Sequence, residues 1–224
     1  LQSLFRAAET TVSPLLLDLD GNGVSTRSIA DGAIHFDHDG NGFAERTGWV
    51  GAGDALLVRD RDGDGRITTG NELFGNHTRL SDGTFAAHGF EALGNLDGNG
   101  DGRIDRRDAV WSELRLWRDD DADADTEPGE LFSLDQLGIE SLSLAYSESS
   151  GTDPQGNRHA QLGTYRTSDG RLLACDDVWF TMDLTRTRQL QPLPVSDAIA
   201  ALPELAGMGL VPSLHQAIAA RPDG

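Results

Sequence analysis

Short apolar runs alternate with acidic, glycine-rich loops along the first 60 residues of the chain. The runs at residues 14–17, 33–36 and 55–58 each lead into such a loop, and residues 43–50 can face residues 33–36. Runs of this length, bounded by Asp and Gly, are typical of strands rather than helices. We therefore predict a strand before each of these loops, with residues 33–36 and 43–50 as the two arms of a hairpin.

Later segments divide between helical and strand patterns. From residue 85 to residue 96, the apolar residues Phe85, Phe90, Leu93 and Leu96 recur at helical spacing. Further helices are predicted at residues 108–114, at 133–137 behind a Ser133 cap, and in the tail at 196–202 and 213–220. Strands are predicted at residues 139–146, 161–167 and 171–182, the last two joined by a turn at Ser168-Asp169-Gly170.

Five acidic loops place oxygen-bearing side chains at alternate positions. Numbered along the chain, loops 1 to 5 begin at Asp18, Asp37, Asp60, Asp97 and Asp119. Ca²⁺ takes about 6–8 oxygens, and an EF-hand loop supplies them from positions 1, 3 and 5, the carbonyl at 7, position 9 and a carboxylate at 12. The predicted calcium ligands are Asp18, Asp20, Asn22 and the Val24 carbonyl; Asp37, Asp39, Asn41, the Phe43 carbonyl and Glu45; Asp60, Asp62, Asp64, the Arg66 carbonyl and Glu72; Asp97, Asn99, Asp101, the Arg103 carbonyl and Asp108; and Asp119, Asp121, Asp123, the Asp125 carbonyl and Glu130.

The five loops are not equivalent. Loop 4 fits the twelve-residue pattern best, and a predicted helix on each side of it indicates an EF-hand. Loop 5 has Ala124 where a sharp turn favours glycine, and loop 3 closes one residue late at Glu72. Loops 1 and 2 lack an acid at position 12 and must borrow a ligand, for which Asp31 is one candidate. Asp, Asn and Gly also form turns unaided, but five such loops together favour a cation.

These elements predict an α+β fold in which EF-hand-like calcium loops are joined by short strands and helices. A β-hairpin-rich C-terminal part and a short helical tail complete it. We predict a linker or lead-in at residues 1–13, a calcium-binding module at 14–185 and a helical tail at 186–224.

Charge and composition narrow the partners. The chain has 37 Asp+Glu against 18 Lys+Arg, a formal charge of −19, so nucleic acid is not an expected partner. No apolar run approaches 18 residues, so no membrane span is expected. The single cysteine, Cys175, and the four tryptophans are interpreted as core residues, and His38 inside loop 2 is expected to face solvent. Because the chain starts at Leu1, we expect it to be a piece of a longer polypeptide.

Several motifs resemble the calcium-dependent self-processing module of repeat-in-toxin (RTX) proteins of the FrpC-like, iron-regulated family. They lie at residues 14–23, 36–49, 71–75, 89–93, 116–119 and 177–180. The resemblance implies a module of a large bacterial toxin-type protein, secreted by type I secretion, that Ca²⁺ folds outside the cell. It also implies autoproteolysis of an Asp-Pro bond at the amino edge of the module. In that reaction the Asp side chain forms a cyclic anhydride, which water opens or a lysine amine captures as an isopeptide.

The matching position in this chain is Ser13, before Pro14. A serine hydroxyl cannot form the anhydride, and the chain has no lysine to accept an isopeptide bond. The leading hypothesis is therefore a calcium-binding module of a larger RTX-type polypeptide that folds after export. One alternative is an autoproteolytic module inactivated by Ser13. A second is a calcium-rigidified adhesin segment that binds a host-cell surface ligand. The chain's one Asp-Pro bond, Asp153-Pro154, is interpreted as an ordinary turn.

Overall fold

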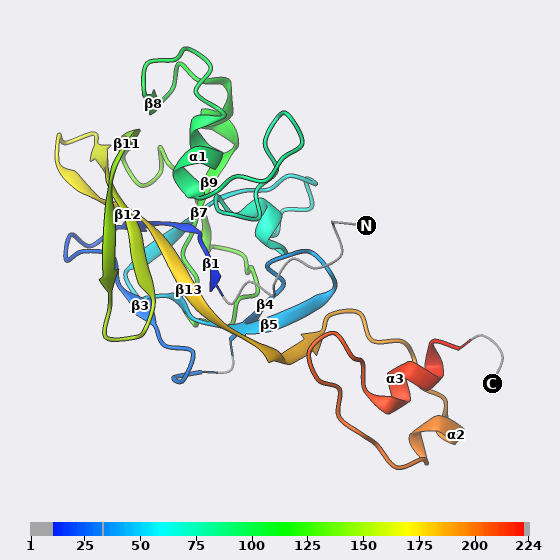
Figure 1. Cartoon of the computed structure of the whole chain (residues 1–224). Helices are drawn as coiled ribbons and strands as arrows, with labels where there is room; N and C mark the ends of the chain where they lie inside the picture. Colours follow the sequence, from blue (N-terminus) through cyan, green and yellow to red (C-terminus); the bar gives the residue numbers. More distant parts are fainter. Residues whose placement is uncertain (1–10, 33, 222–224) are drawn as a thin grey trace.

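The computed structural model describes residues 11–32 and 34–221, and a large antiparallel sheet dominates it (Figure 1). Its strands run in the order β10-β9-β7-β2-β13-β12-β11-β8, while β1 and β5 also pair with β13, and β4 pairs with β5. Strands β3 and β6 form a separate pair. The strands are β1 (Thr11–Val12), β2 (Leu15–Asp18), β3 (Thr26–Arg27), β4 (His35–Phe36), β5 (Phe43–Thr47), β6 (Trp49–Val50), β7 (Asp54–Arg59), β8 (Arg103–Ile104), β9 (Leu114–Trp117), β10 (Leu131–Ser133), β11 (Ile139–Thr152), β12 (Arg158–Thr167) and β13 (Leu172–Gln189).

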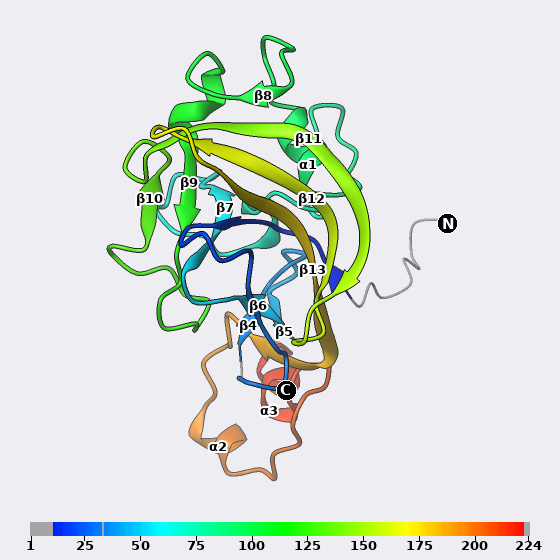
Figure 2. The ribbon, with the colours of Figure 1, turned by 90° about the vertical axis from the view of Figure 1, so that its left-hand side faces the viewer.

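Strand β13 organises the sheet. Its first part pairs with β12 on one side and with β2 on the other, and its last residues pair with β5. Figure 2 shows β11, β12 and β13 lying side by side as three long, curved strands. The short strands that carry the acidic loops are thereby attached to a frame built by the last third of the chain.

The central strands bury both of their faces. On β2, Leu15 and Leu17 pack into one hydrophobic cluster, whereas Leu16 packs into a second cluster behind the sheet. Strand β7 divides in the same way, with Leu57 in the first cluster and Leu56 in the second. A strand covered on both faces needs apolar residues at successive positions, which explains why these segments are continuous apolar runs.

The α+β prediction with EF-hand loops is wrong, because strands make up most of the regular secondary structure, with 39% strand and 11% helix. The helical segments are α1 (Gly89–Gly94), α2 (Asp197–Ala200), α3 (Leu214–Ala219) and 3₁₀ turns at Gly70–Glu72 and Ala109–Glu113. The predicted helix at 85–96 shrinks to α1, the one at 108–114 is the second 3₁₀ turn, and residues 134–137 form a turn. These segments are too short to be stable as free helices, and pairing with long strands determines the fold instead.

The predicted strands agree with the structure more closely than the helices. The runs before loops 1, 2 and 3 form β2, β4 and β7, and β4 pairs with β5 as a hairpin; residue 33 lies outside the described residues. The C-terminal strands are present and longer than predicted, and the backbone of Thr167 and Arg171 closes the predicted turn. Of the predicted lead-in, residues 1–10 lie outside the described residues.

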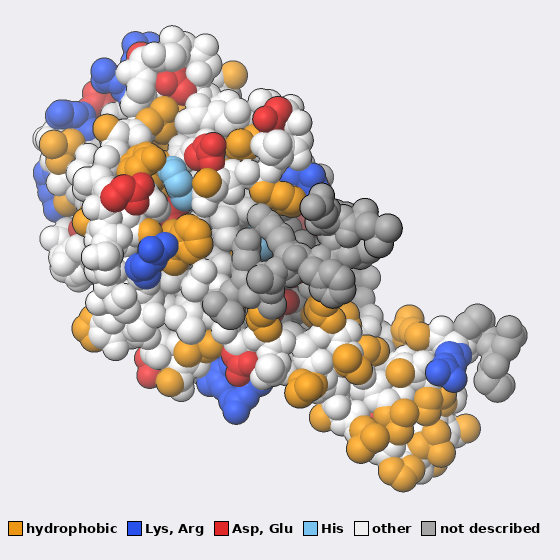
Figure 3. Space-filling model, in the orientation of Figure 1, with side chains coloured by type: hydrophobic (Ala, Val, Ile, Leu, Met, Phe, Trp, Pro, Cys, Tyr) orange, Lys and Arg blue, Asp and Glu red, His pale blue; other side chains and the backbone are white. Residues whose placement is uncertain are grey.

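The two tail helices are present but shorter than predicted, and each begins behind a serine cap. The Ser196 hydroxyl accepts a hydrogen bond from the Ile199 amide, and the Ser213 hydroxyl accepts one from the Gln216 amide. Figure 3 shows apolar side chains gathered on this tail. Leu205 is one of its exposed apolar residues. Within residues 11–32 and 34–221, no helix is long and apolar enough to cross a membrane.

Candidate metal loops and the buried 13–14 junction

All five acidic loops hold their first aspartate in one way. Its two carboxylate oxygens accept hydrogen bonds from the backbone amides at positions 4 and 6 of the loop, at 2.7–2.9 Å. Positions 4 and 6 have positive φ in every loop, and they are glycine in loops 1 to 4. In loop 5 they are Ala122 and Ala124, with φ of 61° and 62°. The repeated motif therefore encodes a turn that fixes the orientation of one carboxylate.

A second carboxylate accepts a hydrogen bond from the position-2 amide in each loop. We call this second group the closing acid. The closing acids and their amide donors are Asp54 with Leu19, Glu45 with His38, Glu72 with Arg61, Asp108 with Gly98, and Glu130 with Asp120. The position-1 carboxylate and the closing acid are therefore both held by the backbone of the same loop.

Loops 3, 4 and 5 share a further contact. The closing acid's other oxygen accepts a hydrogen bond from the position-9 amide, at 2.8 Å for Glu72, 3.0 Å for Asp108 and 3.1 Å for Glu130. Glu72 stands one residue later than the other two, yet it makes the same pair of backbone contacts. The extra residue is therefore accommodated without loss of the closing acid.

The closing acid of loop 1 is Asp54, which the sequence analysis missed. Asp54 begins β7 and is paired directly with Asp18 of β2. Its carboxylate also accepts hydrogen bonds from the Ser25 amide and hydroxyl, at 2.8 and 2.6 Å. Asp31, which was the predicted borrowed ligand, is instead exposed, and its carboxylate accepts a hydrogen bond from the Ser28 amide. The sequence does hold a signal for this contact, because the apolar runs that form β2 and β7 are each flanked by an Asp, Asp18 and Asp54.

Carboxylate oxygens from three residues lie within 4.8 Å of one another in four of the loops. Within the described part of the chain these clusters are Asp18, Asp20 and Asp54; Asp37, Asp39 and Glu45; Asp60, Asp62 and Asp64; Asp119, Asp121 and Glu130; and Asp121, Asp123 and Glu127. The predicted carboxylate ligands of loops 1, 2, 3 and 5 are thus brought together, except Glu72. The Glu72 carboxylate instead accepts hydrogen bonds from backbone amides of loop 3.

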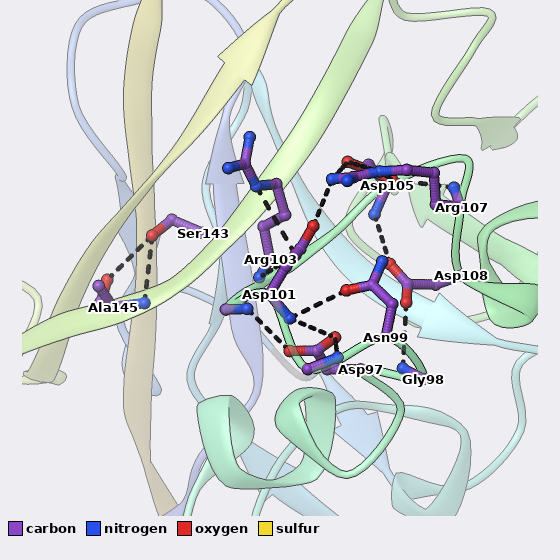
Figure 4. Close-up of polar contacts among 12 residues, drawn as sticks. Asp97, Gly98, Asn99, Asp101, Arg103, Asp105, Arg107, Asp108, Ser143 and Ala145 are labelled. Atoms are coloured by element: carbon purple, nitrogen blue, oxygen red, sulfur yellow. Dashed lines mark hydrogen bonds and ion pairs between the residues drawn. The ribbon is translucent and has the colours of Figure 1, made fainter.

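Loop 4, the best match to the sequence pattern, is arranged differently. Arg107 forms ion pairs with Asp101 and Asp105, the latter at 2.7 Å (Figure 4). Figure 4 also shows Asp97 clamped by its loop amides and Asp108 bonded to Gly98 and Asp105. A cation in this loop must compete with the Arg107 guanidinium for the Asp101 carboxylate.

Two acids of loop 2, Asp37 and Glu45, are buried, and their negative charge is poorly compensated by protein groups. Glu45 is only 4% exposed, and its Oε2 has no hydrogen-bond partner. Burial, and then the nearby Asp39 charge, raise the pKa of Glu45 to about 7. Burial likewise raises the pKa of Asp37, of Asp54 and of Asp119. A divalent cation among these oxygens would remove this penalty, and the all-oxygen donor set suits Ca²⁺.

Loop 5 is joined to the tryptophan core. The Trp49 indole donates to Asp119 at 2.7 Å, and the Trp117 indole donates to Glu130 at 3.2 Å. The two indole rings meet edge to face with centroids 5.5 Å apart, and both side chains are fully buried. The interpretation of these tryptophans as core residues is confirmed, and their fluorescence should report on loop 5.

The Ser13–Pro14 junction is buried beside two polar side chains. Ser13 is 1% exposed; its amide donates to Asn76 Oδ1 at 3.1 Å, and its Oγ accepts the Asn76 amide at 3.2 Å. The Ser13 hydroxyl also donates to the fully buried carboxyl of Asp177. A Cβ on Gly75 would lie 2.1 Å from the Ser13 carbonyl oxygen, so only glycine permits this approach. The junction is therefore enclosed by specific contacts.

One short segment, residues 69–76, joins two acidic loops to this junction. The Gly70 amide donates to the Asp37 carbonyl of loop 2 at 2.9 Å, and Glu72 closes loop 3. The same segment then supplies Gly75 and Asn76 to the junction. His38 was expected to face solvent, but it is 2% exposed and helps to line a small cavity of about 10 Å³ beside Ser13.

Comparison with known proteins places the chain in a family. The SPM domain model matches residues 15–181, and the chain therefore belongs to the SPM domain family. Among curated relatives, the iron-regulated protein FrpA of Neisseria meningitidis serogroup C is 42% identical over 208 residues. That match covers 92% of this chain but only 19% of the relative.

Proposed function

We propose that this chain is a calcium-binding module that folds when Ca²⁺ enters its acidic loops. The observation that carries the proposal is the repeated geometry of the loops, in which a clamped first aspartate and a closing acid share one loop backbone. Loop 2 adds a buried carboxylate oxygen on Glu45 that no protein group satisfies. A buried group of this kind costs free energy unless a ligand completes its contacts.

The donor set favours calcium over other cations. The clustered ligands are carboxylates, and zinc would prefer His or Cys, which none of these clusters contains. Mg²⁺ keeps several waters and seldom uses all-protein cages, whereas Ca²⁺ accepts many oxygens in irregular geometry. Five such ions would bring about ten positive charges to a chain of formal charge −19. In that state binding free energy becomes folding free energy.

We propose further that the chain acts within a larger secreted polypeptide of the RTX type. The match to FrpA, which covers 19% of that protein, is consistent with one module among others. Calcium is scarce in the cytosol and abundant outside, so a calcium-dependent fold would form after export, as type I secretion of an unfolded chain requires. We propose that this larger polypeptide is a toxin-type protein.

The test is a calcium titration of the metal-free protein. Circular dichroism, tryptophan fluorescence and calorimetry should together report a cooperative transition, with Mg²⁺ at equal concentration producing little change. Trp49 and Trp117 make fluorescence a local probe, because their indoles bond the acids of loop 5. A protein equally folded in chelator and in millimolar Ca²⁺ would contradict the proposal.

A second function is favoured by the buried junction. We propose that the Ser13–Pro14 site is a self-processing junction at which serine has replaced the reactive acid. It is supported by the contacts of Asn76, Gly75 and Asp177 with Ser13, and by the resemblance to modules that cut before this proline. This chain is then inactive, because a hydroxyl cannot form the cyclic anhydride.

Ser13→Asp tests this second function directly. With Ca²⁺ and the upstream residues present, the variant should be cut before Pro14, as seen by gel and mass spectrometry, while the matched Ser13→Asn variant should stay intact. A calcium-loaded, folded Ser13→Asp protein that is not cut would exclude the processing function and leave the folding function untouched. The adhesin hypothesis, with its host-cell ligand, gains no support from the described residues.

A further inference from the structure

Asp177 is a buried carboxyl that belongs to none of the acidic loops. It lies on β13 and is fully buried. Its Oδ2 accepts the Gly89 amide, the Ser13 hydroxyl donates to the carboxyl, and its Oδ1 has no hydrogen-bond partner. An ionised carboxylate held this way would be costly, since two hydrogen bonds do not replace the hydration of a full charge.

The charges around Asp177 do not offset its burial. Burial is the largest influence and raises its pKa well above the ordinary value, with Glu148 of β11 acting in the same direction. Three influences lower the pKa of Asp177: the hydrogen bonds from Gly89 and Ser13, and the charge of Arg158 on β12. On its own strand, the neighbouring thiol of Cys175 is buried and has a raised pKa. Burial thus favours the protonated form of the Asp177 carboxyl.

The backbone places this acid beside the junction. Asp177 is paired with Leu15 of β2, and the Val178 amide donates to the Pro14 carbonyl at 3.0 Å. The backbone at Asp177 therefore lies beside Pro14, and the Asp177 carboxyl contacts the side chain of Ser13, the residue before Pro14. The Asn76 amide, which now donates to the Ser13 Oγ, lies where it would also donate to a carboxylate at position 13.

We propose that Asp177 is the proton donor to the Pro14 nitrogen when the residue at position 13 carries a carboxylate. This inference rests on the second proposed function, processing at the 13–14 junction. It assigns a catalytic residue to that site, one that this chain retains although Ser13 silences the reaction. Asn76 acts as a positioning residue that holds the side chain and amide of position 13.

The proposed reaction requires an aspartate at position 13. A carboxylate oxygen attacks that residue's own carbonyl carbon, a five-membered anhydride forms, and the carbon–nitrogen bond to Pro14 breaks. The electron pair remains on the proline nitrogen, which takes the proton from Asp177. Water then opens the anhydride to two carboxyl groups and returns one proton to Asp177. Without a donor the nitrogen would have to leave as an anion, which is why an acid is needed at this place.

The test compares variants in a Ser13→Asp background. Asp177→Asn, which keeps the shape of the side chain, should slow cutting by about 100-fold or more, as expected for loss of a general acid. Asp183→Asn is the matched control, because Asp183 is an acid of the same strand that contacts Thr185 instead. It should cut at the rate of Ser13→Asp. Calcium-induced tryptophan fluorescence verifies that each protein is folded.

The pH profile of Ser13→Asp alone supplies a second measurement that needs no change at Asp177. The rate should fall on the alkaline side, where the donor loses its proton, and Asp177→Asn should lack this limb. Equal rates with and without Asp177 would overturn this inference while leaving the processing function standing. A rate that does not fall as the pH rises would overturn it as well. A folded Ser13→Asp protein that is never cut would overturn both.

Discussion

Asp54 stands directly opposite Asp18 in the antiparallel pairing of β2 and β7, and its carboxylate accepts the amide of Leu19. The acid that completes loop 1 therefore comes from a neighbouring strand, 36 positions along the chain, rather than from position 12 of the loop. Loop 1 can be completed only after the central strands have paired. Folding of the sheet and assembly of this candidate site are thus the same event.

Asp54→Asn should weaken calcium binding at loop 1 by about tenfold or more, because a charged ligand is replaced by a neutral one. Isothermal calorimetry on the folded protein should show one weakened site among the others. Asp31→Asn is the matched control, since Asp31 is exposed and its carboxylate accepts the Ser28 amide. Equal weakening by both variants would mean that general charge, not ligation, matters.

The sequence predicted the parts of each site that are local, and missed the parts that depend on pairing. The Gly-x-Gly spacing is sufficient to infer the clamp on the first aspartate, because the amides at positions 4 and 6 are its donors. Asp54 lies outside any loop pattern, since only the register of β2 and β7 brings it to Asp18. Arg107, which pairs with the acids of loop 4, was also missed.

The fold class was wrong for a related reason. The stretch from Phe85 to Leu96 does have helical spacing, but α1 occupies only Gly89–Gly94 of it. Short helical periods predict helices that the structure shortens, whereas β13, with 18 residues, pairs with four different strands and sets the architecture. The strands themselves were predictable from their apolar runs. Their joining into one sheet was not, because pairing between distant segments leaves no local pattern.

Loop 5 carries a measurable backbone strain at Ala122. Its φ of 61° is the left-handed region that glycine adopts at this position in the other loops. Ala122→Gly should stabilise the calcium-loaded protein by up to about 1 kcal/mol, reduced by the loss of a partly buried methyl group. Thermal unfolding should show a rise of about 2–4 °C per kcal/mol for a chain of this size.

The reverse change in loop 3 is the matched control. Gly63 has a φ of +78°, and a Cβ added to it would meet no atom within 4 Å. Gly63→Ala should therefore destabilise the protein by about 1 kcal/mol through backbone strain alone. If both substitutions shifted the melting temperature in the same direction, the strain at Ala122 would not be the cause.

Glu72 connects loop 3 to the 13–14 junction through the segment that ends at Asn76. Glu72→Gln should loosen this segment, because it weakens the contacts with Thr68 and Arg61 and removes a charge from loop 3. Hydrogen exchange should then become about tenfold faster at the Leu15 amide, which bonds the Phe74 carbonyl at 3.0 Å. Asp108→Asn in loop 4 is the control and should leave that amide protected. An unchanged Leu15 amide in Glu72→Gln would show that loop 3 and the junction are independent.

His159 gives the folded protein a pH dependence of its own. Its Nδ1 lies 2.9 Å from Asp176, and its Nε2 lies 3.4 Å from Asp153, so a protonated ring joins two carboxylates. The hydrogen bond with Asp176, opposed by burial, raises the pKa of His159 above the ordinary value of 6.5. The protonated form is thus favoured by folding. Its contribution is fully present below pH 6.5 and is lost as the pH rises through the higher folded-state pKa.

His159→Gln at saturating Ca²⁺ should cost about 1.5–3 kcal/mol near pH 6, the range for hydrogen bonds to charged groups, and clearly less near pH 9. Urea unfolding of the unsubstituted protein and of His159→Gln at both pH values gives the difference in their free energies of unfolding. Because both proteins bind calcium, taking this difference cancels the effect of pH on calcium binding. His88→Gln serves as the control, because the His88 ring bonds the Glu91 amide and Tyr146 rather than carboxylates. A loss of stability that is the same at pH 6 and pH 9 would assign His159 to packing alone.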